Sequence, residues 1–158
     1  MRRVLGSRDC VVCGAENPSG MRLRFAVDAA GASTEWTVAP AFQGFRDVLQ
    51  GGMILAILDD CMWYAVYGRG GVTLTAEASV RYRARVAVGA QVRASAEVVS
   101  SRGRLWICRA ELRRAGSGEL LASAEGRFMH VPERDLEPLI GATAVHELPA
   151  ATPEGERP

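Results

Sequence analysis

Lysine is absent from this sequence, so arginine supplies all 19 basic residues, and histidine occurs only twice, at positions 130 and 146. The 18 acidic residues bring the formal net charge to +1, which gives no general attraction to nucleic acids or membrane surfaces. The sequence also lacks a Gly-x-Ser-x-Gly motif and a phosphate-binding P-loop. These absences argue against a Ser-His-Asp hydrolase, a nucleotide-binding enzyme, and a nucleic-acid or membrane partner.

No apolar segment follows the arginine pair at the N-terminus, so we expect no secretory signal and a cytoplasmic protein. In that reducing compartment four cysteines do not indicate a disulfide framework. Cys10 and Cys13 form a Cys-x-x-Cys motif, which is half of a zinc site. Because structural zinc takes four ligands and no second motif is present, we expect no metal, unless two protomers share one ion. Cys61 and Cys108 lie in apolar segments and are expected in the core.

The composition, with 48% hydrophobic and 23% charged residues, is typical of one globular domain. Residues 1–20 are polar and are interpreted as a lead-in that carries the Cys-x-x-Cys motif. Five of the seven prolines and six acidic residues lie in 131–158, which is interpreted as a partly ordered tail. The folding unit is therefore expected over 21–130.

Within that unit the hydrophobic period changes twice. Alternation over 21–28 and 33–40 predicts a hairpin, and 13 apolar residues among the 15 of 53–67 predict a buried helix too short to span a bilayer. Alternation returns in 72–86, 92–100, 105–113 and 120–130, which predicts long strands. A single helix that is apolar nearly all round must be enclosed, so we expect an α+β fold with a curved antiparallel sheet wrapped around it.

Two features of the helix region indicate chemistry. Asp59 and Asp60 interrupt an apolar helix, where a carboxylate is costly unless it is paired or functional. Gly51 and Gly52 lie at the helix start, where free N–H groups and the helix dipole favour an oxyanion. The plain alternatives are a solvent-facing helix edge for the two acids and a flexible junction for the two glycines.

The spacing of these features predicts an assembly. Asp59 lies seven residues after Gly52, which is about 10 Å along the helix axis. A carbonyl held on the glycine amides is then too far from Asp59 of the same chain for attack at about 3 Å. If both features are catalytic, a partner subunit supplies the acid, and we expect a homodimer or a dimer of dimers. Asp60 is the alternative candidate for the catalytic acid, but it points about 100° away from Asp59, so only one of the two can share the face of Gly52. The spacing favours Asp59, and Asp60 is expected to bind a loop or an arginine.

Residues 10–130 resemble hotdog-fold acyl-CoA thioesterases of the PaaI-like branch. The resemblance rests on Gly51-Gly52 followed by Asp59 in an apolar helix, and on the strand pattern Thr75-x-Glu-x-x-Val-x-Tyr. The opening Cys10-Val-Val-Cys-Gly-Ala-Glu-Asn-Pro-Ser-Gly-Met is similar to the start of many members of that branch.

The resemblance implies that the Gly51 N–H polarises the thioester carbonyl, with Gly52 beside it in the substrate site. It also implies that Asp59 activates water or attacks the carbonyl, and that the Thr75 hydroxyl assists. Coenzyme A is then part of the substrate, and no cofactor is expected. The sequence departs from the family where Gln50 replaces the usual histidine. It departs again where Gly44 occupies an Asn or Gln position.

Gln50 and Gln43 carry amide groups that can replace the missing hydrogen-bond donors. The pattern also predicts Arg81, Arg83 and Arg85 on one strand face, where Arg83 and Arg85 are candidates to bind the coenzyme A phosphates. An exposed or subunit-packing face is the alternative interpretation of these arginines. The functional alternatives are a non-hydrolytic acyl-CoA or lipid binding protein on the same fold, and an interaction module in which Asp59 faces solvent.

Overall fold

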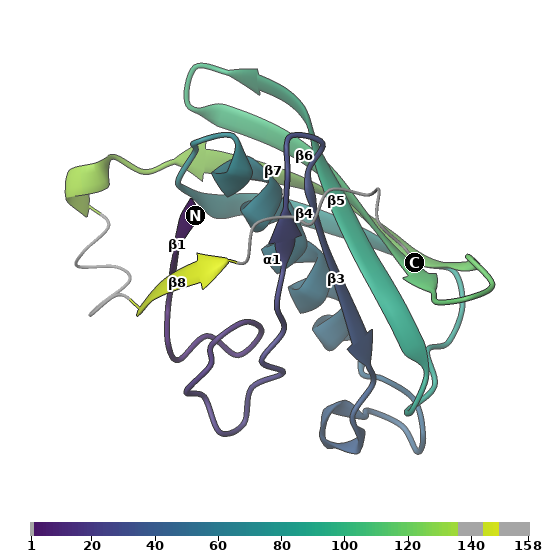
Figure 1. Cartoon of the computed structure of the whole chain (residues 1–158). Coiled ribbons are helices and arrows are strands. Elements are labelled where there is room, and N and C mark those ends of the chain that lie inside the picture. Colours follow the sequence, from purple (N-terminus) through teal and green to yellow (C-terminus); the bar gives the residue numbers. More distant parts are fainter. Residues whose placement is uncertain (1, 136–143, 149–158) are drawn as a thin grey trace, which may run out of the picture.

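The computed structural model describes residues 2–135 and 144–148 of the chain. One long helix, α1 (Gly51–Gly68), packs against the concave face of a six-stranded antiparallel sheet (Figure 1). The strand order is β2-β3-β5-β6-β7-β4. The strands of this sheet are β2 (Ala26–Val27), β3 (Ala32–Thr37), β4 (Thr73–Tyr82), β5 (Gln91–Arg102), β6 (Leu105–Arg114) and β7 (Leu120–His130). The predicted α+β architecture, with a curved sheet around one apolar helix, is confirmed.

Helix α1 begins at Gly51, and the Gln50 side chain caps it by accepting a hydrogen bond from the Met53 N–H at 3.1 Å. A side-chain acceptor at the cap satisfies one of the N–H groups that lack an intrahelical partner. Buried side chains lie around most of the helix circumference, as the sequence pattern predicts. They include Ile57, Leu58, Cys61 and Met62, none more than 1% exposed. No helix in the described part of the chain meets the length and hydropathy needed to span a membrane.

Buried and exposed side chains alternate along the long strands. In β5 every second residue from Val92 to Val98 is buried against the helix, which is the pattern of a sheet with one covered face. The hairpin of β2 and β3 forms as predicted, although β2 contains only two residues. A short 3-10 helix (Pro40–Phe42) and a loop then lead from β3 into α1.

The N-terminal segment packs against this core. Val12, Cys13, Met21 and Leu23 are each at most 7% exposed and belong to the same hydrophobic cluster as α1. Ahead of them β1 (Arg2–Gly6) lies side by side with β8 (Ala144–Leu148) in a separate two-stranded sheet (Figure 1). A second 3-10 helix (Glu133–Asp135) follows β7. Residues assigned to the lead-in by composition therefore contribute to the core.

Strand β4 lies at the edge of the six-stranded sheet and pairs with β7 alone. It also contains a β-bulge between Thr75 and Glu77, where the register with β7 shifts by one residue. A bulge reverses which face odd and even positions occupy. Thr73 and Thr75 therefore face α1 before the bulge, and Ala78, Val80 and Tyr82 face it after the bulge. Strict alternation along the predicted strand would place Leu74 on the apolar face with Ala78 and Val80, but Leu74 is 53% exposed.

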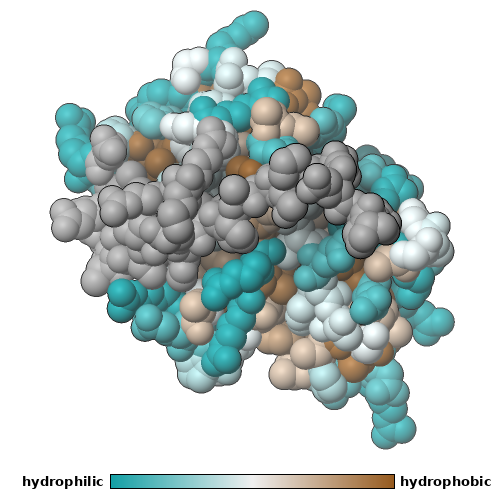
Figure 2. All heavy atoms as spheres, in the orientation of Figure 1, coloured by the Kyte–Doolittle hydropathy of each residue, from teal (hydrophilic) through white to brown (hydrophobic). Residues whose placement is uncertain are grey.

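The surface of the described residues shows no single apolar region in the view of Figure 2. Hydrophilic and hydrophobic residues are interspersed over the part of that face that the coloured atoms show. The large apolar side chains that are most exposed are scattered through the described chain. They are Val11, Phe45, Leu74, Tyr82, Val99 and Met129.

Candidate active site

The edge strand β4 runs antiparallel to α1, and three hydrogen bonds join the two elements. The Tyr82 hydroxyl donates to the Gly51 carbonyl at 2.8 Å, at the start of the helix. Thr75 bonds Asp59 in the middle of the helix, and the indole N–H of Trp63 donates to the Thr73 carbonyl at 2.8 Å. The helix start and Asp59 therefore both lie along the unpaired edge of the sheet.

Asp59 is half-buried, and the Thr75 hydroxyl lies 2.9 Å from its Oδ1 and 3.2 Å from its Oδ2. Burial raises the pKa of Asp59, because a charged carboxylate loses hydration, and the hydrogen bond from Thr75 partly opposes this rise. The carboxylate is thus held in one orientation and made more basic than an exposed aspartate. This arrangement suits a general base and does not match the solvent-facing alternative.

Thr75 reaches Asp59 because of the β-bulge. Strict alternation places Thr75 with Glu77, Ser79 and Arg81 on the polar face of the strand. The shift between Thr75 and Glu77 separates it from that group and turns its hydroxyl toward the helix. The structure therefore brings together two of the residues that the sequence nominated.

Gly51 and Gly52 form the first turn of α1, as predicted. Among the described residues, no acceptor takes a hydrogen bond from the N–H of Gly51 or the N–H of Gly52. Gly52 is exposed, and a Cβ at Gly51 would meet only the Tyr82 ring, at 3.4 Å. Two free N–H groups at the positive end of a helix dipole form a site for an oxyanion.

The amide side chains of Gln50 and Gln43 lie in the loop that precedes the helix. Each uses its oxygen to accept a backbone N–H, from Met53 for Gln50 and from Asp47 at 3.2 Å for Gln43. An amide whose oxygen is held in this way presents its NH2 group as a donor. Gly44 packs against Gln50, where a Cβ would lie 3.2 Å from Gln50 Cγ. The loop therefore places both donors near the helix start.

Arg83 and Arg85 are not on a strand face, so that prediction was wrong. Strand β4 ends at Tyr82, and the backbone N–H groups of Arg83 and Ala84 both donate to the Leu121 carbonyl. This turn breaks the alternation on which the prediction relied. Arg81, Arg83 and Arg85 are all exposed, and Arg81 and Arg83 flank Tyr82, the residue of β4 that contacts the helix start.

Asp60 points away from Asp59, into the N-terminal loop. One of its carboxylate oxygens and the Cys10 and Cys13 sulfurs all lie within 4.8 Å of one another. The expectation that Asp60 contacts a loop is thereby confirmed, although no sequence pattern identifies that loop as the Cys-x-x-Cys segment.

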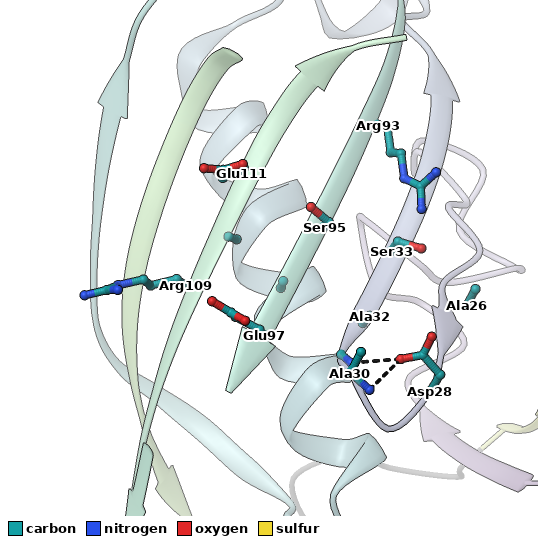
Figure 3. Close-up of a pocket in the computed structure, with 13 residues that line it drawn as sticks. Ala26, Asp28, Ala30, Ala32, Ser33, Arg93, Ser95, Glu97, Arg109 and Glu111 are labelled. Atoms are coloured by element: carbon teal, nitrogen blue, oxygen red, sulfur yellow. Dashed lines mark hydrogen bonds between the residues drawn. The ribbon is translucent and has the colours of Figure 1, made fainter. Parts of the chain in front are cut away.

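A groove of about 530 Å³ lies elsewhere, on the outer face of the sheet (Figure 3). Its labelled side chains, including Arg93, Ser95, Glu97 and Arg109, project from β5 and β6 on the side opposite α1. At its rim Asp28 accepts hydrogen bonds from the Ala30 and Gly31 N–H groups at 2.7 and 2.9 Å. None of the candidate site residues lines this groove.

Tyr82 is a site residue that sequence reasoning missed. Its position on the apolar face of the predicted strand signals burial, yet it is 51% exposed and bonded to the first residue of α1. The signal available in the sequence was its place in the Thr75-x-Glu-x-x-Val-x-Tyr pattern.

The chain matches a family model by sequence and several solved structures by fold. The family model described as Thioesterase superfamily matches residues 47–121, the range that holds α1, β4, β5 and β6. None of the curated proteins compared with the chain matches it significantly.

Among solved structures, a thioesterase superfamily protein matches with a TM-score of 0.73 and 24% identity, over 77% of this chain and 60% of its own. The chain thus spans 60% of the length of that protein. The Escherichia coli PaaI protein from the phenylacetic acid degradation operon matches with a TM-score of 0.66 and 15% identity, over 71% of this chain and 81% of its own.

A hypothetical thioesterase from Streptococcus pneumoniae, solved with coenzyme A, matches with a TM-score of 0.66 and 12% identity, over 69% of this chain and 88% of its own. Alanine variants of that protein at an aspartate and at a threonine 16 residues later also match. The family match over the helix and adjoining strands shows that the chain is similar to the Thioesterase superfamily, and the solved structures show that it shares the hotdog fold.

Proposed function

We propose that the chain is an acyl-CoA thioesterase whose two active sites are shared between the subunits of a homodimer. The observation that carries the proposal is the Asp59 and Thr75 pair. The pair lies on the same sheet edge as the free N–H groups of Gly51 and Gly52. Along the helix, Asp59 follows Gly51 by eight residues. Eight residues of helix span about 12 Å, so one thioester does not reach both groups of a single chain.

In the proposed reaction, the N–H groups of Gly51 and Gly52 in one subunit bind the thioester carbonyl oxygen. Asp59 of the partner subunit accepts a proton from a water molecule, whose oxygen attacks the carbonyl carbon. The N–H groups stabilise the negative charge of the tetrahedral intermediate, an effect of about 3 kcal/mol for one such donor. The carbon–sulfur bond then breaks, and the proton on Asp59 passes to the leaving sulfur. The products are a carboxylic acid and free coenzyme A, and no cofactor takes part.

The exposed edge of β4 supports the assembly. This strand has a neighbour on one side only, and Thr75, Glu77, Ser79 and Tyr82 along it are exposed. An unpaired edge is a template for a second strand. In a symmetric antiparallel pair in which Ser79 lies opposite its own counterpart, the one-residue bulge after Thr75 brings Thr75 opposite Tyr82 of the partner subunit. Thr75 bonds Asp59 and Tyr82 bonds Gly51, so this pairing brings the acid of one subunit to the helix start of the other.

Two further observations support coenzyme A as the leaving group. The Streptococcus pneumoniae protein of the same fold was solved with coenzyme A. Its altered aspartate and threonine are 16 residues apart, as Asp59 and Thr75 are here. The exposed Arg83 and Arg85 follow Tyr82, which bonds the first residue of α1, and are proposed to bind the coenzyme A phosphates.

The test is release of free thiol from a panel of aliphatic and aromatic acyl-CoA esters. Asp59→Asn is expected to lower kcat by about a hundredfold or more, because a general base contributes that much. Glu111→Gln, which removes an exposed carboxylate on β6, is the matched control and is expected to keep full activity. Full activity of Asp59→Asn would overturn the proposal.

A second function is favoured by one observation. Gln50 stands where the family has a histidine, and its amide oxygen is used to cap the helix. A protein with that change could bind acyl-CoA and leave it intact. Such a binding protein would retain the thioester over hours at stoichiometric concentration, whereas the proposed enzyme releases thiol from it.

A further inference from the structure

We propose that Cys10, Cys13 and Asp60 form a zinc-binding site that joins the N-terminal loop to helix α1. The ligand atoms of these residues lie within 4.8 Å of one another. Zinc–sulfur bonds of about 2.3 Å and zinc–oxygen bonds of about 2.1 Å place tetrahedral ligands about 3.6 to 3.8 Å apart, so the three side chains would close in by about 1 Å or less to bind the ion. The cluster lies on the face of α1 that Asp60 occupies, so it is separate from the Asp59 site.

The local geometry of the loop suits a metal-bound thiolate. The Cys10 sulfur accepts the N–H of Val12 at 3.3 Å and the N–H of Cys13 at 3.5 Å. The Gly14 N–H donates to the Cys10 carbonyl at 3.0 Å and closes the turn. A Cβ at Gly14 would lie 2.4 Å from the Cys10 nitrogen, so the turn requires glycine there. The loop thus folds both sulfurs toward Asp60.

The Asp60 carboxylate has a buried oxygen suited to a cation. Asp60 Oδ2 is buried, and no donor among the described residues reaches it. A buried carboxylate oxygen without a partner is costly, because the lost hydration is not replaced. No arginine in the described part of the chain forms an ion pair with Asp60. A divalent ion bound to this oxygen would remove that cost.

The titratable groups of the cluster agree with the zinc proposal. Burial and the nearby Cys10 thiolate raise the pKa of Asp60 to about 7. The hydrogen bond from Cys13 lowers the pKa of Cys10 to about 5, while the same bond and burial raise the pKa of Cys13. Burial and the neighbouring Cys13 raise the pKa of Tyr64, so its hydroxyl stays protonated, and Asp59 is the other carboxylate near the cluster. Zinc would displace the protons of its ligands, because thiols and carboxyls bind the ion in their deprotonated forms.

Zinc is the cation that the ligands favour. Two thiolates select a soft or borderline metal over magnesium or calcium, and a carboxylate completes three of the four tetrahedral positions. The Tyr64 hydroxyl lies within hydrogen-bond reach of the Cys13 thiol. This inference revises the expectation of no metal, which counted cysteines and histidines and overlooked Asp60 as the third ligand.

The experiment measures zinc in the full chain after expression with added zinc. We expect about one zinc per chain, and after removal and replacement by Co²⁺ we expect thiolate-to-cobalt charge-transfer absorption. Asp60→Asn and Cys13→Ala are expected to weaken zinc binding at least about tenfold. Asp59→Asn and Cys108→Ala are the matched controls, because they change the adjacent aspartate and a buried thiol outside the cluster, and both are expected to keep zinc.

A second measurement keeps the test decisive if a variant folds poorly. Zinc added to the metal-free wild-type chain is expected to raise Tm, whereas magnesium is not, since a metal that binds only the folded state stabilises it. Two results would overturn the proposal. One is a wild-type chain that neither retains zinc nor gives the cobalt absorption. The other is a chain whose mass and blocked thiols show a Cys10–Cys13 disulfide after purification with zinc present.

Discussion

Thr75 and Asp59 are joined across the space between β4 and α1 by a hydrogen bond of 2.9 Å. The bond crosses from an edge strand to a buried helix, and it orients the carboxylate that we propose as the general base. Removing the hydroxyl with Thr75→Val is expected to lower kcat by about tenfold, the effect of one hydrogen bond to a charged group. Thr75→Ser keeps the hydroxyl and is expected to retain most of the activity.

The Thr75→Val variant has a second readout, the pH dependence of kcat/KM. The hydrogen bond from Thr75 lowers the pKa of Asp59 against the rise caused by burial. Loss of the bond therefore raises the pKa of the carboxyl, and the base is protonated up to a higher pH. The acid limb of the profile is expected to move to higher pH in Thr75→Val. A profile that keeps its position while activity falls would mean that Thr75 has a purely structural role.

Gly51 offers a test of the proposed oxyanion site that leaves the helix intact. Proline removes the N–H, fits the first helical position, and tolerates the extended conformation of Gln50 before it. Gly51→Pro is expected to lower kcat by about 10² to 10³, the cost of one lost oxyanion donor. Gly51→Ala keeps the N–H, and its Cβ would lie 3.4 Å from the Tyr82 ring, an ordinary contact.

Alanine and proline at position 51 are therefore compared at equal folded fractions, measured by circular dichroism. We expect Gly51→Ala to remain within about threefold of the wild type, since both the N–H and the helix are kept. Equal activity of the two variants would exclude the Gly51 N–H from catalysis.

The proposed pairing of β4 with its counterpart predicts a cross-link. If Ser79 lies opposite its own counterpart in the pair, the two Cα atoms at position 79 lie within the distance of about 4.4 to 6.8 Å that a disulfide spans, and both side chains point to the same face of the sheet. Ser79→Cys is expected to form a covalent dimer on mild oxidation, visible on a non-reducing gel. Ser95→Cys, an exposed position on β5, is the control and is expected to stay monomeric on the gel. A covalent dimer of Ser95→Cys and none of Ser79→Cys would place the subunit interface elsewhere.

The helix and its acid could be predicted from the sequence because their signals are local. An apolar run interrupted at Asp59 and preceded by Gly51 specifies a buried helix with a glycine start, and the structure has that helix over Gly51–Gly68. Strand β7 was placed in the same way, from alternation between two turns, at Leu120–His130.

Other features depend on contacts between distant segments, which periodicity does not reveal. The bulge after Thr75 is fixed by pairing with β7, and it decides that Thr75 faces Asp59 and that Leu74 faces outward. The end of β4 at Tyr82 removed Arg83 from the predicted strand face for the same reason. The meeting of Asp60 with Cys10 joins residues 50 positions apart, and no spacing rule links them.

The most direct test of the shared site mixes two inactive variants. Asp59→Asn and Gly51→Pro, carrying different affinity tags, are produced together, and the species that carries both tags is purified and assayed for thiol release. In a mixed dimer with shared sites, one site contains both changes and the other contains neither. The account predicts that this species recovers about half of the wild-type activity per dimer. Activity no higher than that of the separate variants, in a stable mixed dimer, would contradict it, because each site would then be built from one chain.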